Sequence, residues 1–479
     1  MKKRSMTQNA VLNTIKTIMS MIFPLITFPY ASRVLQVDNI GKVNYSASII
    51  SYFFLLAGLG IKTYAIREGA RIRDDRKALE KFTNQMFTIN MLSTAVSYLL
   101  LVILVYISPK LNSYSELIAI QSIGIIGTTV GIEWLYTINE DYYYITMRSI
   151  FVQFVSMILL FALVHTKEDY IVYAGITVFA TTASYVFNFF HARRIVRIRL
   201  VKNLDLSIHL KPIMILFAMS IATTIYVNSD ATMLGALCGD YYVGIYSTST
   251  KMYSILKNVM SACILVALPR LSNCLATSDR GKFEYTAGKI LDSCTVILFP
   301  AIVGTFMLAN NIILILAGKT FGEAAVALKI LCISLLFSIF AIYMTNVVLL
   351  PAKKEKDIMY ATIASAGINI VLNFIFIPLL KHNGAAITTA ISEAVVLIWQ
   401  IIVARKYLRV RIDKKDIGKV MLGCISIVTV CIVVNYINLS LLMDTMFKVG
   451  FSVFAYVSVL LLTKHKTVMS FIGRIKEKK

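Results

Sequence analysis

The sequence predicts an all-α, polytopic membrane protein with about fourteen transmembrane helices. Hydrophobic residues make up 58% of its 479 residues and charged residues only 15%, which is too apolar for a soluble chain. Each bilayer-spanning helix needs about 20 residues, so this hydrophobic content is enough for roughly fourteen spans. The formal net charge is +23, and the positive residues gather in alternate loops, as they do in multi-pass membrane proteins.

Fourteen windows are long and apolar enough to cross a bilayer. They cover residues 10–31, 41–61, 86–108, 115–137, 143–164, 170–190, 212–235, 245–268, 288–308, 323–346, 358–380, 384–404, 417–436 and 441–463. The connections between them are mostly short, so no soluble domain is expected between helices. The apolar stretch behind the basic N-terminus runs past the length of a signal peptide, so we expect it to be retained as the first helix.

The distribution of Lys and Arg predicts the topology. With the N-terminus inside, the expected cytoplasmic segments hold 35 of the 48 basic residues and the external loops hold 5. Positive residues remain on the cytoplasmic side of membrane proteins, so both termini are predicted to be cytoplasmic in a bacterial cell membrane. The net charge is therefore explained by topology, with anionic membrane lipid as the partner and no nucleic acid.

A weak internal echo predicts two halves. Gly41 is followed by Tyr-Ser-Ala-Ser from residue 45, and Gly244 by Tyr-Ser-Thr-Ser from residue 246. The offset of a little over 200 residues carries six spans onto six, which is one of the standard plans of transporters. We therefore predict six-helix lobes at residues 1–205 and 206–411, and two extra helices with a basic tail at 412–479.

The basic loop after the second span leaves two interpretations open. Ala65, Ile72, Leu79 and Phe82 share one helical face, which would suit a short helix lying on the cytoplasmic leaflet. Alternatively, the loop is a solvated run of charge that only fixes the topology.

Sequence motifs for catalysis or cofactor binding are not found. The five histidines fall in loops or at span ends, and the seven cysteines form neither a disulfide framework nor a metal-ligand pattern. We therefore expect no enzyme, no metal and no cofactor, and favour transport without covalent chemistry.

Several basic residues lie inside the predicted spans, where an ionised side chain near the helix centre costs about 2.5–3.5 kcal/mol and needs a partner or water. Lys257 is the deepest, about 18 Å into the eighth span at 1.5 Å per residue. Lys251, six residues earlier, lies on a different face of the same helix. Lys16 and Arg148 lie nearer span ends, so snorkelling to the surface or anchoring of the helix is the alternative interpretation.

Four acidic residues also lie inside spans, namely Glu133, Asp230, Asp292 and Glu393. Each of them neutralises a buried lysine, or else basic groups line a cavity and bind an anion while the acids orient them. The sequence alone gives no pairing. The residues assigned to such an anion site are Lys16, Arg33, Glu133, Arg148, Asp230, Lys251 and Lys257.

Four segments resemble the Wzx-type oligosaccharide flippases of bacteria, which belong to the multidrug, oligosaccharidyl-lipid and polysaccharide exporter superfamily. The likeness extends over about 400 residues, and its most specific part is the spaced set Glu133-Trp134, Glu140, Tyr144 and Arg148. The segments are PLITFPYASRVLQVDNIGKVNYSASIISYF (24–53), GIEWLYTINEDYYYITMRSI (131–150), VGIYSTSTKMYSILKNVMSACILVALPRLS (243–272) and GINIVLNFIFIPLLKHNGAAITTAISE (367–393). One position departs from the usual SRVLG, because this sequence has Gln36 in place of the glycine.

The resemblance implies two six-helix lobes that alternate access and carry a polyprenyl-diphosphate-linked glycan from the inner to the outer leaflet, for surface polysaccharide biosynthesis. It also implies a cationic cavity, which Lys251 and Lys257 fit by position. A polysaccharide polymerase and glycosyltransferases are the protein partners that such a role suggests. The alternative is a cation-coupled small-molecule efflux antiporter of the same superfamily, for which buried acids in the first lobe are expected, and the first and second spans have none.

Overall fold

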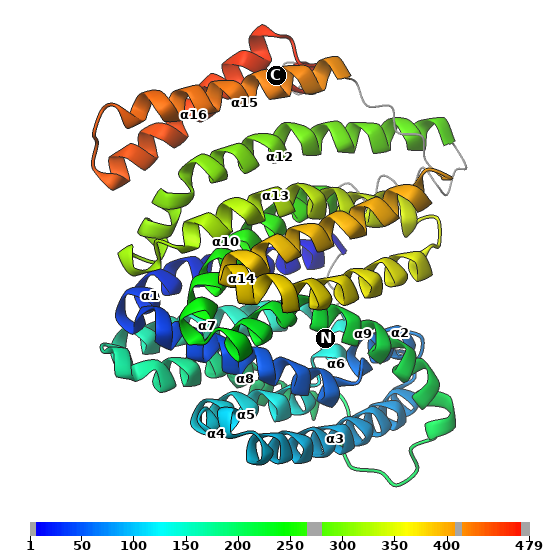
Figure 1. Cartoon of the computed structure of the whole chain (residues 1–479). Helices are drawn as coiled ribbons and strands as arrows, with labels where there is room; N and C mark the ends of the chain where they lie inside the picture. The colour runs from blue at the N-terminus through cyan, green and yellow to red at the C-terminus, as the bar shows by residue number, and fades with distance from the viewer. Residues whose placement is uncertain (1–5, 266–279, 408–413, 471–479) are drawn as a thin grey trace. The chain divides into compact units, whose positions relative to one another are not determined.

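The computed structural model describes residues 6–265, 280–407 and 414–470. It divides into two compact units, Met1–Gly244 and Ile245–Lys479. Figure 1 shows helices throughout, and every regular element of the described ranges is helical. The predicted all-α class is therefore confirmed, while the predicted lobe boundaries near residues 205 and 411 stay predictions.

Unit 1 is built around its first helix. The long α1 packs against α3, α5, α7 and α9, and α8 packs against α5 and α7. The bounds are α1 Met6–Gly58, α2 Ile61–Gly69, α3 Arg76–Ile107, α4 Pro109–Asn112, α5 Ser115–Gly131, α6 Glu133–Ile138, α7 Tyr142–Leu163, α8 Tyr170–Ala192 and α9 Leu206–Leu237, with a 3-10 turn at Lys167–Asp169. Helix α10, Asp240–Leu265, begins in unit 1 and continues into unit 2.

Unit 2 has α13 packed between α12 and α14, and a C-terminal pair, α15 and α16, packed on α12. Its elements are α12 Arg280–Leu316, a 3-10 turn Lys319–Phe321, α13 Ala324–Tyr343, a π-helical segment Met344–Leu349, α14 Glu355–Ala404, α15 Lys414–Asn435 and α16 Leu441–Leu462.

The helices account for the predicted spans. Eleven segments of the described residues are long and apolar enough to cross a membrane. Two of them, α1 and α14, each contain two predicted windows separated by a break, at Gln36 and Lys381. The eighth window falls on α10, which is outside the eleven and carries Lys251 and Lys257. The protein is therefore a multi-pass membrane protein whose helices agree with the fourteen windows.

The break in α1 lies at the residue where the usual sequence has glycine. Gln36 adopts φ 65° and ψ 177°, a backbone conformation that glycine reaches without strain and other residues rarely adopt. Its side-chain amide donates a hydrogen bond to the carbonyl of Arg33 at 2.6 Å. The turn between the first two spans is thus kept, with a glutamine in a glycine geometry.

We expect the substitution Gln36→Gly to stabilise the protein by about 1 kcal/mol. Strain in such a backbone region costs about 1–3 kcal/mol, and the extra flexibility of an unfolded glycine offsets about 0.5–1 kcal/mol of the relief. The midpoint of thermal unfolding of detergent-purified protein measures the effect. A lower midpoint than wild type would contradict the strain at Gln36.

The two glycines of the internal echo lie at one helix crossing. A Cβ at Gly41 would overlap the carbonyl of Asp240, and a Cβ at Gly244 would overlap the carbonyl of Val37. The contact is reciprocal, because each glycine lies against the carbonyl of the residue four positions before the other glycine. The second half of α1 and the start of α10 therefore cross with their backbones in contact. The small residues permit this approach, as in other close helix pairs in membranes.

Gly41→Ala is expected to destabilise the protein by about 1–3 kcal/mol, because the added methyl group forces two packed backbones apart. Gly58→Ala in the same helix is the matched control, since a Cβ there meets nothing within 4 Å and alanine favours the helix. Thermal unfolding of both variants should show a loss for Gly41→Ala only. Equal unfolding midpoints for the two variants would mean that the helix crossing at Gly41 has room for a methyl group.

The basic loop after the second span folds onto the protein instead of the membrane. Ala65, Leu79 and Phe82 are buried in an apolar cluster that includes Trp134, and Ile72 packs against it. The segment forms α2 and the start of α3. The shared apolar face is therefore real, but its partner is the interior of unit 1.

Helices α15 and α16 form a hairpin that is fixed to α12 by apolar packing and by polar contacts (Figure 1). The Tyr456 hydroxyl donates to the carbonyl of Val296 at 2.7 Å. Asp444 accepts from Asn311 at 2.6 Å and pairs with Lys448, also at 2.6 Å. Buried polar groups hydrogen-bonded to each other in this way hold helices together within a membrane.

Candidate functional site

The predicted site residues fall in both units. Arg33 is exposed, and its guanidinium donates to the carbonyl of Pro29 at 2.7 Å. Asp230 is buried in α9, with 4% of its surface exposed. The remaining unit 1 residues, Lys16, Glu133 and Arg148, lie close together, whereas Lys251 and Lys257 belong to unit 2.

Glu133 is the centre of the unit 1 group. Its carboxylate pairs with Lys16 Nζ at 3.0 Å and with Lys62 Nζ at 2.9 Å. Helix α5 ends at Gly131, the next residue, Ile132, has a φ of 39° in the left-handed region, and Glu133 then begins α6. This break turns the carboxylate toward the lysines of α1 and α2.

The two lysines are more accessible than the acid that joins them. The exposed fraction of the side chain is 32% for Lys16 and 64% for Lys62, against 20% for Glu133. Solvent-exposed ion pairs are worth only about 0–1 kcal/mol, so these contacts are weak enough to be exchanged. The lysines are therefore available to a dissolved or lipid-borne anion.

Arg148 lies behind this group and lacks hydrogen bonds at two of its nitrogens. It is 8% exposed, and its Nε and Nη1 atoms have no hydrogen-bond partner in the described part of the chain. Glu133 is near enough to attract it electrostatically. A buried guanidinium with free donors is costly and is satisfied best by a carboxylate or a phosphate.

Three cations therefore surround one carboxylate, which leaves the group of Lys16, Lys62, Glu133 and Arg148 with a surplus of positive charge. We call these four residues the unit 1 cluster. The structure brings together three of the predicted residues here and adds Lys62, which the charge count had assigned only to topology. Its proximity depends on the turn at Gly60, where φ is 73°, and a single sequence carries no signal for the direction of that turn.

Aromatic rings line the side of the cluster that carries Arg148. The Tyr144 ring stacks on His191 with a centroid distance of 4.2 Å and on Tyr136 at 5.2 Å. The Arg148 guanidinium carbon lies 5.7 Å from the centroid of Tyr144. These rings hold the arginine in place through stacking and cation–π contact.

In unit 2, Lys257 is paired with an acid. Its Nζ lies 2.6 Å from Glu393 Oε1, and the Tyr253 hydroxyl donates to the same oxygen at 3.2 Å. Glu393 is 5% exposed. Of the two interpretations open for Glu393, neutralisation of a buried lysine is the one found here. Lys251 is half-buried on another face of α10.

Comparison with known proteins gives a consistent set of matches. Residues 6–275 match the model of a family described as "Polysaccharide biosynthesis protein". A "Putative O-antigen transporter" of Escherichia coli (strain K12) is 22% identical over 405 residues, which are 82% of this chain and 95% of that protein.

Two solved structures share the fold. The "Lipid II flippase MurJ, inward closed conformation" has a TM-score of 0.72 and 16% identity, and the match covers 94% of this chain and 99% of that one. An inward-facing multidrug resistance transporter of the MATE family and MOP superfamily has a TM-score of 0.60 and 13% identity, over 83% and 97% of the two chains.

Proposed function

Because this chain belongs to the polysaccharide biosynthesis protein family, we propose that it is a flippase for a polyprenyl-diphosphate-linked oligosaccharide. It moves the repeat unit from the inner to the outer leaflet of the bacterial cell membrane by alternating access. The resemblance to Wzx-type flippases is confirmed by the family match and by the O-antigen transporter that aligns over nearly its whole length. The single observation that carries the proposal is this alignment, over 82% of this chain, to 95% of a protein described as a "Putative O-antigen transporter".

We assign the diphosphate of the substrate to the unit 1 cluster. A diphosphate diester carries about two negative charges, and lysine and arginine are the usual partners of such groups. The surplus positive charge of Lys16, Lys62 and Arg148 over Glu133 suits this ligand.

Glu133 acts in this proposal as a placeholder for the substrate. Before binding, its carboxylate satisfies Lys16 and Lys62. The diphosphate then takes over these lysines, and Glu133 turns to Arg148, whose donors are free. When the substrate leaves, Glu133 returns to the lysines, which prevents the cations from holding the product.

The membrane potential favours the proposed direction. Moving one negative charge outward across an inside-negative potential of 100 mV releases about 2.3 kcal/mol. Two charges give roughly twice that amount, provided that the cations of the cluster stay in place while the ligand moves.

Lys251 and Lys257 of unit 2 remain proposed substrate contacts, with Lys257 exchanging Glu393 for phosphate. Arg33 and Asp230 also remain proposed substrate-binding residues, in the exposed and buried positions described above. The polymerase, the glycosyltransferases and the anionic lipid are proposed partners, and the cytoplasmic orientation of both termini is proposed from the charge distribution.

A deletion strain tests the function. We expect the lipid-linked repeat unit to accumulate on the inner leaflet and the surface glycan to be lost, with both restored by the wild-type gene. Drug susceptibility of the same strain tests the antiporter alternative, which predicts hypersensitivity to small cationic drugs with normal surface glycan. Normal glycan without accumulation of the lipid-linked unit would overturn the proposal.

The placeholder role predicts an unusual variant. Glu133→Gln is expected to bind a prenyl diphosphate up to about fivefold more tightly than wild type, because removing the competing, partly exposed ion pairs releases up to about 1 kcal/mol, while export falls because release is slower. Farnesyl diphosphate titrated against detergent-purified protein measures the affinity. Glu68→Gln is the matched control, since among the described residues Glu68 forms ion pairs only with the exposed Arg67 and Arg71 of its own segment. Weaker binding by Glu133→Gln would show that the carboxylate only positions the lysines.

A further inference from the structure

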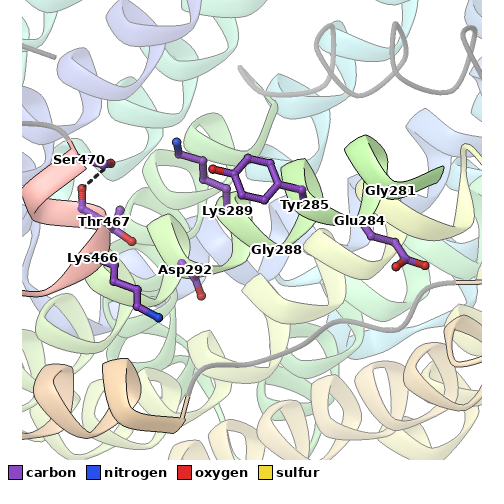
Figure 2. Close-up of a pocket in the computed structure, with 9 residues that line it drawn as sticks. All are labelled: Gly281, Glu284, Tyr285, Gly288, Lys289, Asp292, Lys466, Thr467 and Ser470. Atoms are coloured by element: carbon purple, nitrogen blue, oxygen red, sulfur yellow. Dashed lines mark hydrogen bonds between the residues drawn. The ribbon is translucent and has the colours of Figure 1, made fainter. Parts of the chain in front are cut away.

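Unit 2 contains a polar pocket that is lined by none of the residues assigned to the substrate above. Its volume is about 740 Å³, within the range of about 300–1,000 Å³ that is usual for small-molecule sites. Figure 2 shows the lining side chains, which come from the first turns of α12 and from the turn that follows α16. The lining residues are Gly281, Glu284, Tyr285, Gly288, Lys289, Asp292, Lys466, Thr467 and Ser470.

The pocket lies where the apolar spans end. Helix α16 ends at Leu462, and the lining residues of the C-terminal segment follow within a few positions. On α12, Val296 and Phe299 lie one to two turns beyond the pocket and pack into the apolar cluster with α15 and α16. Tyr285 is 71% exposed, as tyrosines at the membrane–water interface commonly are. The pocket is therefore at the depth of lipid headgroups.

The lining is charged in both senses. Lys289 is half-buried, contacts the Tyr285 ring at 5.9 Å, and makes no ion pair in the described part of the chain. Lys466 adds a second cation, and Glu284 and Asp292 add two carboxylates. In Figure 2 Lys289 extends past the Tyr285 ring toward Thr467 and Ser470, and Glu284 lies at the opposite end of the pocket lining.

We propose that this pocket binds the headgroup of a zwitterionic aminophospholipid, such as phosphatidylethanolamine. The phosphate would lie near Lys289 and Lys466, and the ammonium group near Glu284. Equal numbers of positive and negative side chains give no net attraction to a purely anionic ligand, but they match a ligand that carries both charges. The proposal is independent of the flippase function.

Gly288 lines the pocket, and the helix has space at this position for the first carbon of a side chain. A Cβ at Gly288 would meet nothing within 4 Å, and the same holds for Gly304 in the same helix, outside the pocket. Gly288→Phe would therefore fill the pocket, and Gly304→Phe is its matched control.

The test uses the full chain in nanodiscs that contain equal amounts of phosphatidylethanolamine and phosphatidylglycerol, with bound lipid measured by native mass spectrometry. We expect wild type and Gly304→Phe to retain phosphatidylethanolamine preferentially. Lys289→Gln should lose this retention about tenfold, as expected for removal of a charge-assisted contact of about 1.5 kcal/mol. Gly288→Phe should lose it at least as far, because the ring occupies the space of the headgroup.

Further measurements separate the sources of the phosphate group. Glycerophosphoethanolamine should raise the thermal unfolding midpoint of the wild type, and inorganic phosphate at the same concentration should not. Equal retention of phosphatidylethanolamine by all variants would overturn the site. Preferential retention of phosphatidylglycerol would overturn the zwitterionic assignment, and equal stabilisation by inorganic phosphate would overturn the lipid assignment.

Discussion

The double substitution Lys16→Ala/Lys62→Ala is expected to reduce glycan export at least about tenfold while leaving the amount of protein in the membrane unchanged. Each lysine offers the diphosphate a charge-assisted contact of about 1.5–3 kcal/mol, and 1.4 kcal/mol corresponds to a factor of ten. Both side chains are partly exposed, so their removal leaves no cavity in the core. Surface glycan per cell, measured in the complemented deletion strain, reports the loss.

Lys77→Ala is the control for this experiment. Lys77 is an exposed residue at the start of α3, so the variant loses a positive charge near the same end of unit 1 without touching the cluster. We expect it to export normally. Normal export by the double variant would remove the unit 1 cluster from the site, and equal losses in both variants would indicate an effect of net charge.

The second large effect is expected at the ion pair of unit 2. Glu393→Gln leaves Lys257 in its half-buried position without its carboxylate. Breaking a buried pair by removing one partner costs about 3–5 kcal/mol, and because Lys257 keeps 28% of its side chain exposed, we expect about 3 kcal/mol. The thermal unfolding midpoint of the purified protein should fall accordingly.

The double variant Lys257→Met/Glu393→Gln separates stability from function. Replacing both partners removes the uncompensated charge, so stability should return close to the wild-type level. If Lys257 contacts the substrate, export stays impaired in this stable double variant. Among the single variants, Lys257→Arg should then impair export less than Lys257→Ala does. Restored export in the double variant would mean that the pair has only a structural role.

Much of the fold was predictable because membrane insertion depends on properties that a sequence displays directly. Length, hydropathy and the asymmetry of Lys and Arg locate spans without any knowledge of packing. The breaks were harder to place. Gln36 has none of the conformational freedom that marks such a position, and the buried face of the loop after the second span is equally compatible with lipid and with protein until its partner Trp134 is known.

The site was predictable in its residue types and only partly in its grouping. The energetic cost of charge in a membrane singled out Lys16, Glu133, Arg148 and Lys257. Which charges meet depends on helix rotation and on turns such as that at Ile132, and neither has a signature in a single sequence. The depth of Lys257 in its span therefore predicted a substrate contact, whereas in the structure its ammonium group is paired with Glu393.

The C-terminal hairpin of α15 and α16 touches the remainder of its unit mainly through α12. Its apolar cluster and the contacts of Asp444 and Tyr456 all end on that one helix. A force applied to the hairpin is therefore transmitted to the rest of the unit mainly through its contact with α12. The hairpin is therefore a suitable place to attach a fluorescent label or a surface tether. Any force applied through such an attachment would act first on α12.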